Sequence, residues 1–314
     1  MRTRTPPGHH PRPGALHLLC LMVATVALAA CHPGNVEAKR LRESCDTGDV
    51  AACNQLARKL QKGEYVLQDD PRAAELFDTA CKGGVGDGCA SLGVVYQDAR
   101  GVKRDSARAV PLFQQGCERG AMDGCTRLGI LYRQGAGVTR DIARAAALFQ
   151  QACDGKDMSG CANLGTLYSA GEGVPQDFTR AADLLQRSCT AKEPVGCVGL
   201  GRLHVAGTGV PRNDSTAVAL FEQACDDGEV LGCFHQAALL ESGGAGVPQN
   251  LQSSARLYRT ACEERHAEAC ARLASMFDRG AGVYRQPERA ATFRRRACEY
   301  GHMESCETPK PAGA

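Results

Sequence analysis

The sequence predicts an all-α solenoid built from about seven helix–turn–helix repeats of 36 residues. Cysteines recur in pairs eight residues apart, and the first cysteines of successive pairs are 36 residues apart, except for an interval of 37 between Cys225 and Cys262. Apolar residues between the pairs follow helical spacing, and a glycine-rich stretch interrupts most units once. Self-similarity at a period of 20 to 50 residues is typical of solenoids.

Composition and charge narrow the class of protein. A chain of 314 residues usually indicates two domains, but a repeat array grows by stacking and needs no second core. The formal net charge of +2 indicates neither a nucleic-acid surface nor an acidic tail, so we expect no nucleic-acid partner. The chain has 18 cysteines, and in an exported protein such a number indicates disulfides.

The N-terminus predicts export. Arginines precede an apolar run at Leu16–Ala30, which has the length of a signal-peptide core and is short for a membrane span. The run ends in Leu28–Cys31 (LAAC), which resembles a bacterial lipobox, and the resemblance implies that Cys31 becomes the lipidated N-terminus. His32, at the next position, favours the outer membrane. The alternative is ordinary signal-peptidase cleavage, in which Cys31 has no special role.

The chain therefore falls into four predicted segments. Residues 1–30 form a lipoprotein signal peptide, residues 31–35 a lipidated tether, residues 36–306 the repeat solenoid, and residues 307–314 a disordered tail rich in Pro and Gly. Within the solenoid, Val36–Cys45 is expected to form one capping helix, and seven helix–loop–helix units follow it.

The first helix of each unit, helix A, is expected to begin just before the second cysteine of a pair. The residues three, four and seven positions past that cysteine form a helical stripe with it. The middle of these positions is always small, and glycine holds it at Gly93, Gly129, Gly165 and Gly201. Because Gly inside a helix costs roughly 1 kcal/mol relative to Ala, we expect another helix to approach the backbone there.

A loop with the pattern Gly-x-Gly-Val leads to the second helix, helix B. Its glycines suit the positive φ of a helix C-cap, and its valine is expected to plug the core. Three residues past the valine stands an Asp or Asn suited to N-cap helix B, replaced by Gln286 in the last unit. Helix B then carries a large apolar pair such as Leu112/Phe113. The extra residue of the 37-residue interval falls in Ser242–Gly246, where an insertion costs little.

The cysteine pairs are expected to link each helix B to the next helix A by a disulfide. Eight residues of continuous helix span about 12 Å, whereas a disulfide needs Cα atoms about 4.4 to 6.8 Å apart. The chain must therefore reverse within each pair, and turn-forming residues stand there. Zinc is the alternative, but structural zinc sites space their cysteines more tightly. The predicted bridges are Cys45–Cys53, Cys81–Cys89, Cys117–Cys125, Cys153–Cys161, Cys189–Cys197, Cys225–Cys233, Cys262–Cys270 and Cys298–Cys306.

These patterns together resemble a known family. Leu-Gly-x-x-Tyr, Gly-x-Gly-Val-x-x-Asp and Ala-Ala-x-Leu-Phe-x-x-Ala-Cys are similar to the Sel1-like repeat, a relative of the tetratricopeptide repeat, over residues 36–306. The paired cysteines resemble its cysteine-rich bacterial branch, the Hcp family. His204, Gln236 and Gln286 depart from the pattern in single units. The resemblance implies a right-handed superhelix with a concave groove. It also implies an alternative function, a penicillin-binding protein with weak β-lactamase activity.

The residues themselves do not support an enzyme. A serine β-lactamase uses Ser-x-x-Lys with Ser-Asp-Asn and Lys-Thr-Gly, and the sequence contains none of these motifs. Clustered His and carboxylate ligands, which a metal hydrolase needs, are also missing from the sequence pattern. We therefore expect no catalytic residue, metal or cofactor, and β-lactam hydrolysis as the reaction if the protein is nevertheless an enzyme.

Three histidines and one basic run are the other candidates. His266 and His302 lie one period apart in the turns between paired cysteines, and stacked turns would bring them close, although exposed turn residues are the simpler interpretation. His204 replaces the tyrosine of the helix A stripe and is interpreted as a packed side chain. Arg294–Arg296 is interpreted as a solvated helix face and not as an anion site.

The favoured function is an exported binding scaffold. A solenoid presents a long surface built mainly from helix A, and the positions taken to face solvent vary between units, at Val94-Val95, Ile130-Leu131, Thr166-Leu167 and Arg202-Leu203. The groove is expected to bind a protein or a peptidoglycan-linked ligand, with the lipid holding the array in the cell envelope at the outer membrane. A purely structural envelope component is the remaining alternative.

Overall fold

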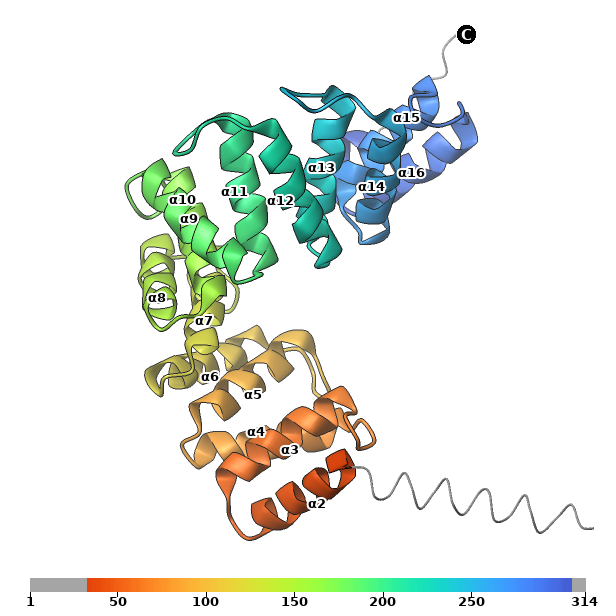
Figure 1. Ribbon diagram of the computed structural model, residues 1–314. Helices are drawn as coiled ribbons and strands as arrows, with labels where there is room; N and C mark the ends of the chain where they lie inside the picture. Colours follow the sequence, from red (N-terminus) through yellow and green to blue (C-terminus); the bar gives the residue numbers. More distant parts are fainter. Residues whose placement is uncertain (1–32, 307–314) are drawn as a thin grey trace, which may run out of the picture. The chain divides into compact units, whose positions relative to one another are not determined.

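The computed structural model describes residues 33–306, which form fifteen α-helices and one short 3₁₀-helix (Figure 1). The predicted signal peptide at 1–30, the lipidated Cys31 and the tail at 307–314 lie outside the described residues. The chain divides into two compact units, the first ending at Gly120 and the second beginning at Ala121. The first unit contains α2–α6, and the second contains α7–α16 and the 3₁₀-helix η1.

The helices alternate between helix A and helix B of successive repeats. The A helices are α3 (Val50–Lys62), α5 (Gly86–Asp98), α7 (Met122–Gln134), α9 (Met158–Ala170), α11 (Pro194–Ala206), α13 (Val230–Ser242) and α15 (Ala267–Arg279). The B helices are α4 (Asp70–Lys82), α6 (Ser106–Glu118), α8 (Ile142–Asp154), α10 (Phe178–Thr190), α12 (Asp214–Asp226), α14 (Leu251–Glu263) and α16 (Pro287–Glu299). Helix α2 (Pro33–Asp46) precedes the array and η1 (Met303–Cys306) follows it. Successive helices pack on one another within each unit, so the fold is an all-α solenoid, as the repeat predicts.

The predicted stripe of helix A forms the core of the repeats. In α3 the stripe consists of Cys53, Leu56, Ala57 and Leu60, and all four are buried. In the other A helices the first three positions of the stripe are buried as well, and the fourth is buried or half-buried. In α13 the leucine position is held by Gln236, which is buried. Burial of one stripe per helix explains why each repeat needs its neighbours to be stable.

The glycines of the stripe lie against the large side chains of helix B. A Cβ built on Gly93 would lie 2.6 Å from the ring of Phe113. The same 2.6 Å approach recurs between Gly129 and Phe149 and between Gly201 and Phe221. The close approach of a second helix, which the glycines predict, is therefore confirmed, and the partner is helix B of the same repeat.

The loops between helices A and B start and stop the helices as predicted. The C-cap residue of helix A takes the left-handed conformation at Gly63, Gly135, Gly171, Gly207 and Gly280, and Ala99 takes it where glycine is missing. An N-cap side chain accepts a backbone hydrogen bond in helix B at Asp69, Asp105, Asp141, Asp177, Asn213 and Asn250. Gln286 makes no such bond in α16.

Disulfides join the B helices to the A helices that follow them. They link Cys45–Cys53, Cys81–Cys89, Cys153–Cys161, Cys189–Cys197, Cys225–Cys233, Cys262–Cys270 and Cys298–Cys306, with Cα atoms 4.5 to 4.8 Å apart. The turn inside each pair needs a positive φ, which Lys156, Lys192 and Arg265 supply where glycine does not. Cys117 and Cys125 lie on opposite sides of the division at residue 120, and their pairing stays a prediction.

Two expectations from the sequence are wrong, and the first concerns the predicted tether at residues 31–35. Helix α2 begins at Pro33 and not at Val36, so part of the segment 31–35 is helical. Proline suits a first helical turn because the N–H it lacks has no helical partner there. The helix buries Ala38 and Leu41, and Leu41 packs in the core cluster of the first repeat.

The second correction concerns the positions taken to face solvent. Val95, Leu131, Leu167 and Leu203 are at most 3% exposed. Val95 packs in a cluster with Leu76 of α4, and Leu203 packs in a cluster with Leu185 of α10. In both cases the partner is helix B of the preceding repeat, so these two positions join successive repeats within a unit. The residues just before them are the more accessible ones, at Val94, Ile130, Thr166 and Arg202.

The one-residue insertion between α13 and α14 forms a small turn that a buried carboxylate holds. The backbones of Gly244 and Val247 exchange hydrogen bonds of 2.8 and 3.0 Å. The carboxylate of Asp214 accepts a hydrogen bond of 2.8 Å from the N–H of Ala245 and pairs with Arg212 at 2.9 Å. The Arg212 guanidinium, followed by the Ala245 N–H, holds the pKa of Asp214 below its ordinary value.

Candidate functional site

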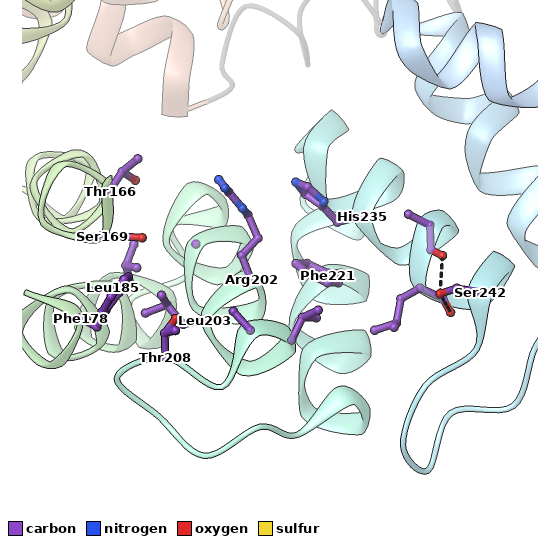
Figure 2. Close-up of a pocket in the computed structure, with 15 residues that line it drawn as sticks. Thr166, Ser169, Phe178, Leu185, Arg202, Leu203, Thr208, Phe221, His235 and Ser242 are labelled. Atoms are coloured by element: carbon purple, nitrogen blue, oxygen red, sulfur yellow. Dashed lines mark hydrogen bonds between the residues drawn. The ribbon is translucent and has the colours of Figure 1, made fainter. Parts of the chain in front are cut away.

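A groove crosses the A helices of the second unit over α9, α11 and α13 (Figure 2). Helix α11 contacts both α9 and α13 directly. The groove has a volume of about 540 Å³ and is lined by Thr166, Ser169, Phe178, Leu185, Gly199, Arg202, Leu203, Val205, Ala206, Thr208, Phe221, His235, Ala238, Leu239 and Ser242.

Gly199 of α11 distinguishes this repeat from the others at the groove. It lies two residues past the second cysteine, where the other A helices carry larger polar side chains (Gln55, Ser91, Arg127, Asn163, His235 and Arg272). A Cβ at Gly199 would lie 2.6 Å from Cδ2 of Leu185 in α10. Without a side chain in the way, Leu185 comes up to the backbone of α11. A comparison of the repeats at this position is the sequence signal that could have located the groove.

The floor of the groove is apolar. Leu185, Leu203, Phe221 and Leu239 line it, and all four side chains are largely withdrawn from solvent within the fold. Val205 extends this apolar surface toward the end of α11. The floor therefore suits apolar side chains of a ligand.

One edge of the groove carries a single positive charge. Arg202 of α11 and His235 of α13 project to the same side (Figure 2). The imidazole of His235 stacks on Phe221, with the ring centroids 5.3 Å apart. Burial, and then the charges of Arg202 and His266, lower the pKa of His235 to about 4. His235 is therefore neutral at neutral pH, and Arg202 is the only charged side chain among the lining residues.

Hydroxyl groups supply most of the other polar atoms. Thr166 donates its hydroxyl hydrogen to the carbonyl of Ala162 at 2.9 Å, and Ser242 donates to the carbonyl of Ala238 at 3.1 Å. Each oxygen still has a lone pair free to accept a hydrogen bond. The groove thus offers acceptors for N–H groups and one guanidinium for an anionic group.

The repeats of the chain match a known family along most of its length. Seven segments match the Sel1 repeat, at residues 50–85, 86–120, 123–157, 159–192, 194–229, 233–266 and 267–302. The chain belongs to the Sel1 repeat family. No curated protein matches the sequence.

Solved structures share this fold. The protective antigen c5321 of uropathogenic Escherichia coli, which displays an SLR fold, is 28% identical and matches 84% of this chain with a TM-score of 0.57. This chain spans 57% of the length of that antigen. A Sel1 repeat protein from Oxalobacter formigenes is 22% identical, with 86% of this chain and 78% of that chain covered and a TM-score of 0.60. Cysteine rich protein B of Helicobacter pylori is 30% identical over 42% of this chain and 95% of its own, with a TM-score of 0.34.

The disulfides make this chain a cysteine-rich Sel1 repeat protein. Because the cytosol keeps thiols reduced, they also indicate that the protein is exported. Sel1 repeat solenoids are scaffolds for protein interaction and typically not enzymes. Within residues 33–306, each helix is too short or too polar to cross a bilayer.

The candidate histidines of the Sel1 array have separate structural contacts. His204 Nδ1 donates to the carbonyl of Pro211 at 3.1 Å and so closes the α11–α12 loop. His266 accepts a backbone hydrogen bond in the first turn of α15. His302 Nε2 lies 3.1 Å from a carboxylate oxygen of Glu268. The described part of the chain holds no cluster of three or more His, Cys, Asp or Glu side chains arranged for a metal ion.

Two arginines of the basic run Arg294–Arg296 also contact neighbouring side chains. Arg294 pairs with Asp278 of α15, and the guanidinium of Arg296 lies 5.6 Å from the ring centroid of Phe293. These contacts agree with a helix face and not with an anion site.

A recurring contact between the two helices of a Sel1 repeat was missed. The arginine three residues after the N-cap of helix B lies over the ring near the end of helix A. The pairs are Arg108 and Tyr96, Arg144 and Tyr132, Arg180 and Tyr168, and Arg289 and Phe277, with the guanidinium carbon 4.5 to 5.9 Å from the ring centroid. The fixed offsets of arginine and ring in the repeat are the signal that could have revealed it.

Proposed function

We propose that this protein is an exported Sel1 repeat scaffold that binds an extended segment of a partner protein in the groove of α9, α11 and α13. The observation that supports this function is the apolar floor beside Gly199, with Arg202 as the one charged group at its edge.

The lining residues define the segment. An apolar side chain fits over Leu185 and Phe221, and an acidic side chain or a terminal carboxylate pairs with Arg202. Backbone N–H groups of the segment reach the hydroxyls of Thr166 and Ser242. The volume of about 540 Å³ lies in the range of pockets that hold small ligands, so only a few residues enter at a time. The apolar floor favours a peptide over a peptidoglycan-linked glycan.

We further propose that residues 1–30 are removed and that the lipidated Cys31 holds the array at the outer membrane, facing the periplasm or the cell surface. The support is the lipobox-like Leu28–Cys31 together with disulfides that form outside the cytosol. Metabolic labelling with palmitate tests the anchor. The label is expected on the wild type and not on Cys31→Ser, and an unlabelled wild type would exclude a lipoprotein.

Site-specific photo-crosslinking tests the groove. A photoreactive amino acid replaces Thr166 in the groove or, as a control, Ala219 on the exposed face of α12. A second change, Ala238→Arg, narrows the groove with the side chain that α11 carries at the equivalent position, Arg202. Its matched control, Ala219→Arg, adds the same side chain outside the groove.

We expect a protein crosslink from position 166 that Ala238→Arg abolishes and Ala219→Arg leaves intact. Mass spectrometry then identifies the crosslinked segment, and a synthetic peptide of that segment should bind the purified chain. Equal crosslinking from position 219, or crosslinking that survives Ala238→Arg, would contradict the groove. A crosslinked glycan would assign the ligand to the peptidoglycan class instead.

A further inference from the structure

A second hollow lies on the B helices of the last two repeats and shares no residue with the groove. It has a volume of about 630 Å³ and lies between α14 and the loop and helix B of the last repeat. Arg256 and Arg259 of α14 and Arg289 of α16 line it, and no acidic residue does. The hollow is therefore strongly positive.

Arg256 and Arg259 are specific to this repeat. They stand six and nine residues after the N-cap Asn250. Among the B helices of the described residues, only α14 has arginine at both positions. The other helices carry Glu75/Asp78, Pro111/Gln114, Ala147/Gln150, Asp183/Gln186, Ala219/Glu222 and Thr292/Arg295 there. The other B helices fold without arginine at both positions, so the fold does not require these two charges. Binding of a negatively charged ligand would account for them.

Arg289 lacks the hydrogen-bond acceptor that the equivalent arginine of an earlier repeat has. It stands three residues after its N-cap, as Arg180 does in α10. Arg180 donates a hydrogen bond of 3.1 Å to the side-chain carbonyl of Gln150 in α8. The residue equivalent to Gln150 in the last pair of repeats is Arg259. A hydrogen-bond acceptor has thus been replaced by a second cation.

Arg289 also lacks the acidic N-cap residue that precedes the equivalent arginine in other repeats. In the corresponding hollow of the first unit, Asp105 lies beside Arg108, with Oδ2 and Nε 3.8 Å apart. Gln286 holds this position in the last repeat and is neutral. Arg256, Arg259 and Arg289 have no ion pair with any other residue of the range 33–306.

Two aromatic side chains, Phe277 and Tyr284, also line the hollow. The guanidinium of Arg289 lies over the ring of Phe277, 5.9 Å from its centroid. Tyr284, at the tip of the α15–α16 loop, is 88% exposed and lines the hollow. Guanidinium groups bind carboxylates through paired N–H donors, and exposed aromatic rings are frequent at protein interfaces.

We propose that this hollow binds an acidic segment of a partner protein, with two or more Asp or Glu side chains paired to Arg256, Arg259 and Arg289. A volume of about 630 Å³ is far larger than one inorganic anion, and the charges come from two different helices. Several carboxylates along one peptide match both features. The site acts independently of the groove, because no residue belongs to both.

Fluorescence anisotropy with a labelled peptide tests the proposal. The probe is a short fluorescein-labelled peptide of alternating Glu and Gly, and the same peptide with Gln for Glu is the control. Both are titrated with the full chain, its disulfides formed, at low and at physiological salt. The double variant Arg256→Ala/Arg259→Gln gives α14 the residues that α8 carries, Ala147 and Gln150. Circular dichroism and the urea unfolding midpoint verify that the variant folds.

We expect the Glu peptide to bind the wild type, the Gln peptide to bind at least tenfold more weakly, and the double variant to lose roughly tenfold in affinity, because two charge-assisted pairs are removed. A quadruple variant adds Ala147→Arg and Gln150→Arg to the double variant. It has the net charge of the wild type, but its two arginines lie on α8, where the acidic N-cap Asp177 accompanies Arg180. No recovery is expected. Full recovery, unchanged affinity in the double variant, or no binding by the wild type overturns the proposal, and so does displacement of the peptide by an equal concentration of inorganic phosphate.

Discussion

Gly201 of α11 lies so close to Phe221 of α12 that a Cβ at position 201 would be 2.6 Å from Cε1 of the ring. Phe221 is 2% exposed and is enclosed by neighbouring side chains. The ring therefore has little room to move away. Glycine at this position sets the distance between the two helices of the repeat.

Replacing this glycine should destabilise the protein. Gly201→Ala gains about 1 kcal/mol of helix propensity, but the added methyl group overpacks the contact with Phe221 at a cost of about 1 to 3 kcal/mol. We expect a lower urea unfolding midpoint for the oxidised protein. Ala219→Gly on the exposed face of α12 measures the propensity effect alone and should cost about 1 kcal/mol. A Gly201→Ala variant that is more stable than the wild type would contradict the packing argument.

The buried imidazole of His235 predicts a pH dependence of stability. Its pKa of about 4 in the folded protein compares with about 6.5 in the unfolded chain. Between these values the unfolded state binds a proton that the folded state does not. Stability is therefore expected to fall as the pH decreases from about 6.5 to about 4, by at most about 3 kcal/mol from this residue, with no further loss below that window.

Thermal unfolding across this pH range measures the effect. His235→Gln introduces the residue that α3 carries at the equivalent position, Gln55, and should have a shallower slope than the wild type. The remaining slope includes His266, whose pKa is also lowered by burial. Equal slopes in the wild type and the variant would show that His235 is not protonated differently on unfolding.

Disulfides of equal ring size should contribute unequally to stability. Cys262 and Cys270 are fully buried between α14 and α15, whereas Cys306 is exposed at the end of the described chain. Loop entropy assigns each ring about 2 to 3 kcal/mol. We expect Cys262→Ala/Cys270→Ala to lose at least this amount, because the interior repeats unfold together.

The terminal bridge should contribute less. Cys298→Ala/Cys306→Ala releases η1 and the end of α16, which can fray while the other repeats stay folded. Hydrogen exchange separates the two cases, since fraying removes protection from α16 alone. Equal losses of global stability in the two double variants would show that the array unfolds as one cooperative body up to its last helix.

The sequence predicts what is fixed within one repeat. The spacing from cysteine to glycine places Gly201 against helix B, and the residue three past the loop valine identifies the N-cap, because both contacts are local. Contacts between repeats are less visible. Leu203 looks like a solvent-facing residue in its own helix, but it is covered by Leu185 of the preceding repeat. The sequence predicts a groove on the A helices but not the residues that line it, because these come from three successive repeats.

The buried carboxylate of Asp214 is harder still to predict. It looks like an ordinary first-turn residue of α12, and its hydrogen-bond donor, the N–H of Ala245, lies 31 positions away. The donor exists only because the α13–α14 loop has an extra residue, and periodicity alone does not show where that residue folds. A side chain whose partner lies in the next repeat can be assigned only once the repeats are stacked.

An acidic residue at the N-cap of α16 should raise the stability of the protein and weaken its binding of the acidic peptide. Gln286→Asp supplies the carboxylate that caps the equivalent helices α4, α6, α8 and α10, and should raise stability by about 1 kcal/mol. The same carboxylate places a negative charge beside Arg289 and should weaken binding of the Glu peptide severalfold. Asp141→Gln makes the reverse change in α8 and should lower stability by a similar amount while leaving peptide binding unchanged. Urea unfolding and anisotropy on the same samples test both effects, and a stabilised Gln286→Asp protein with unaltered peptide affinity would place the acidic segment away from α16.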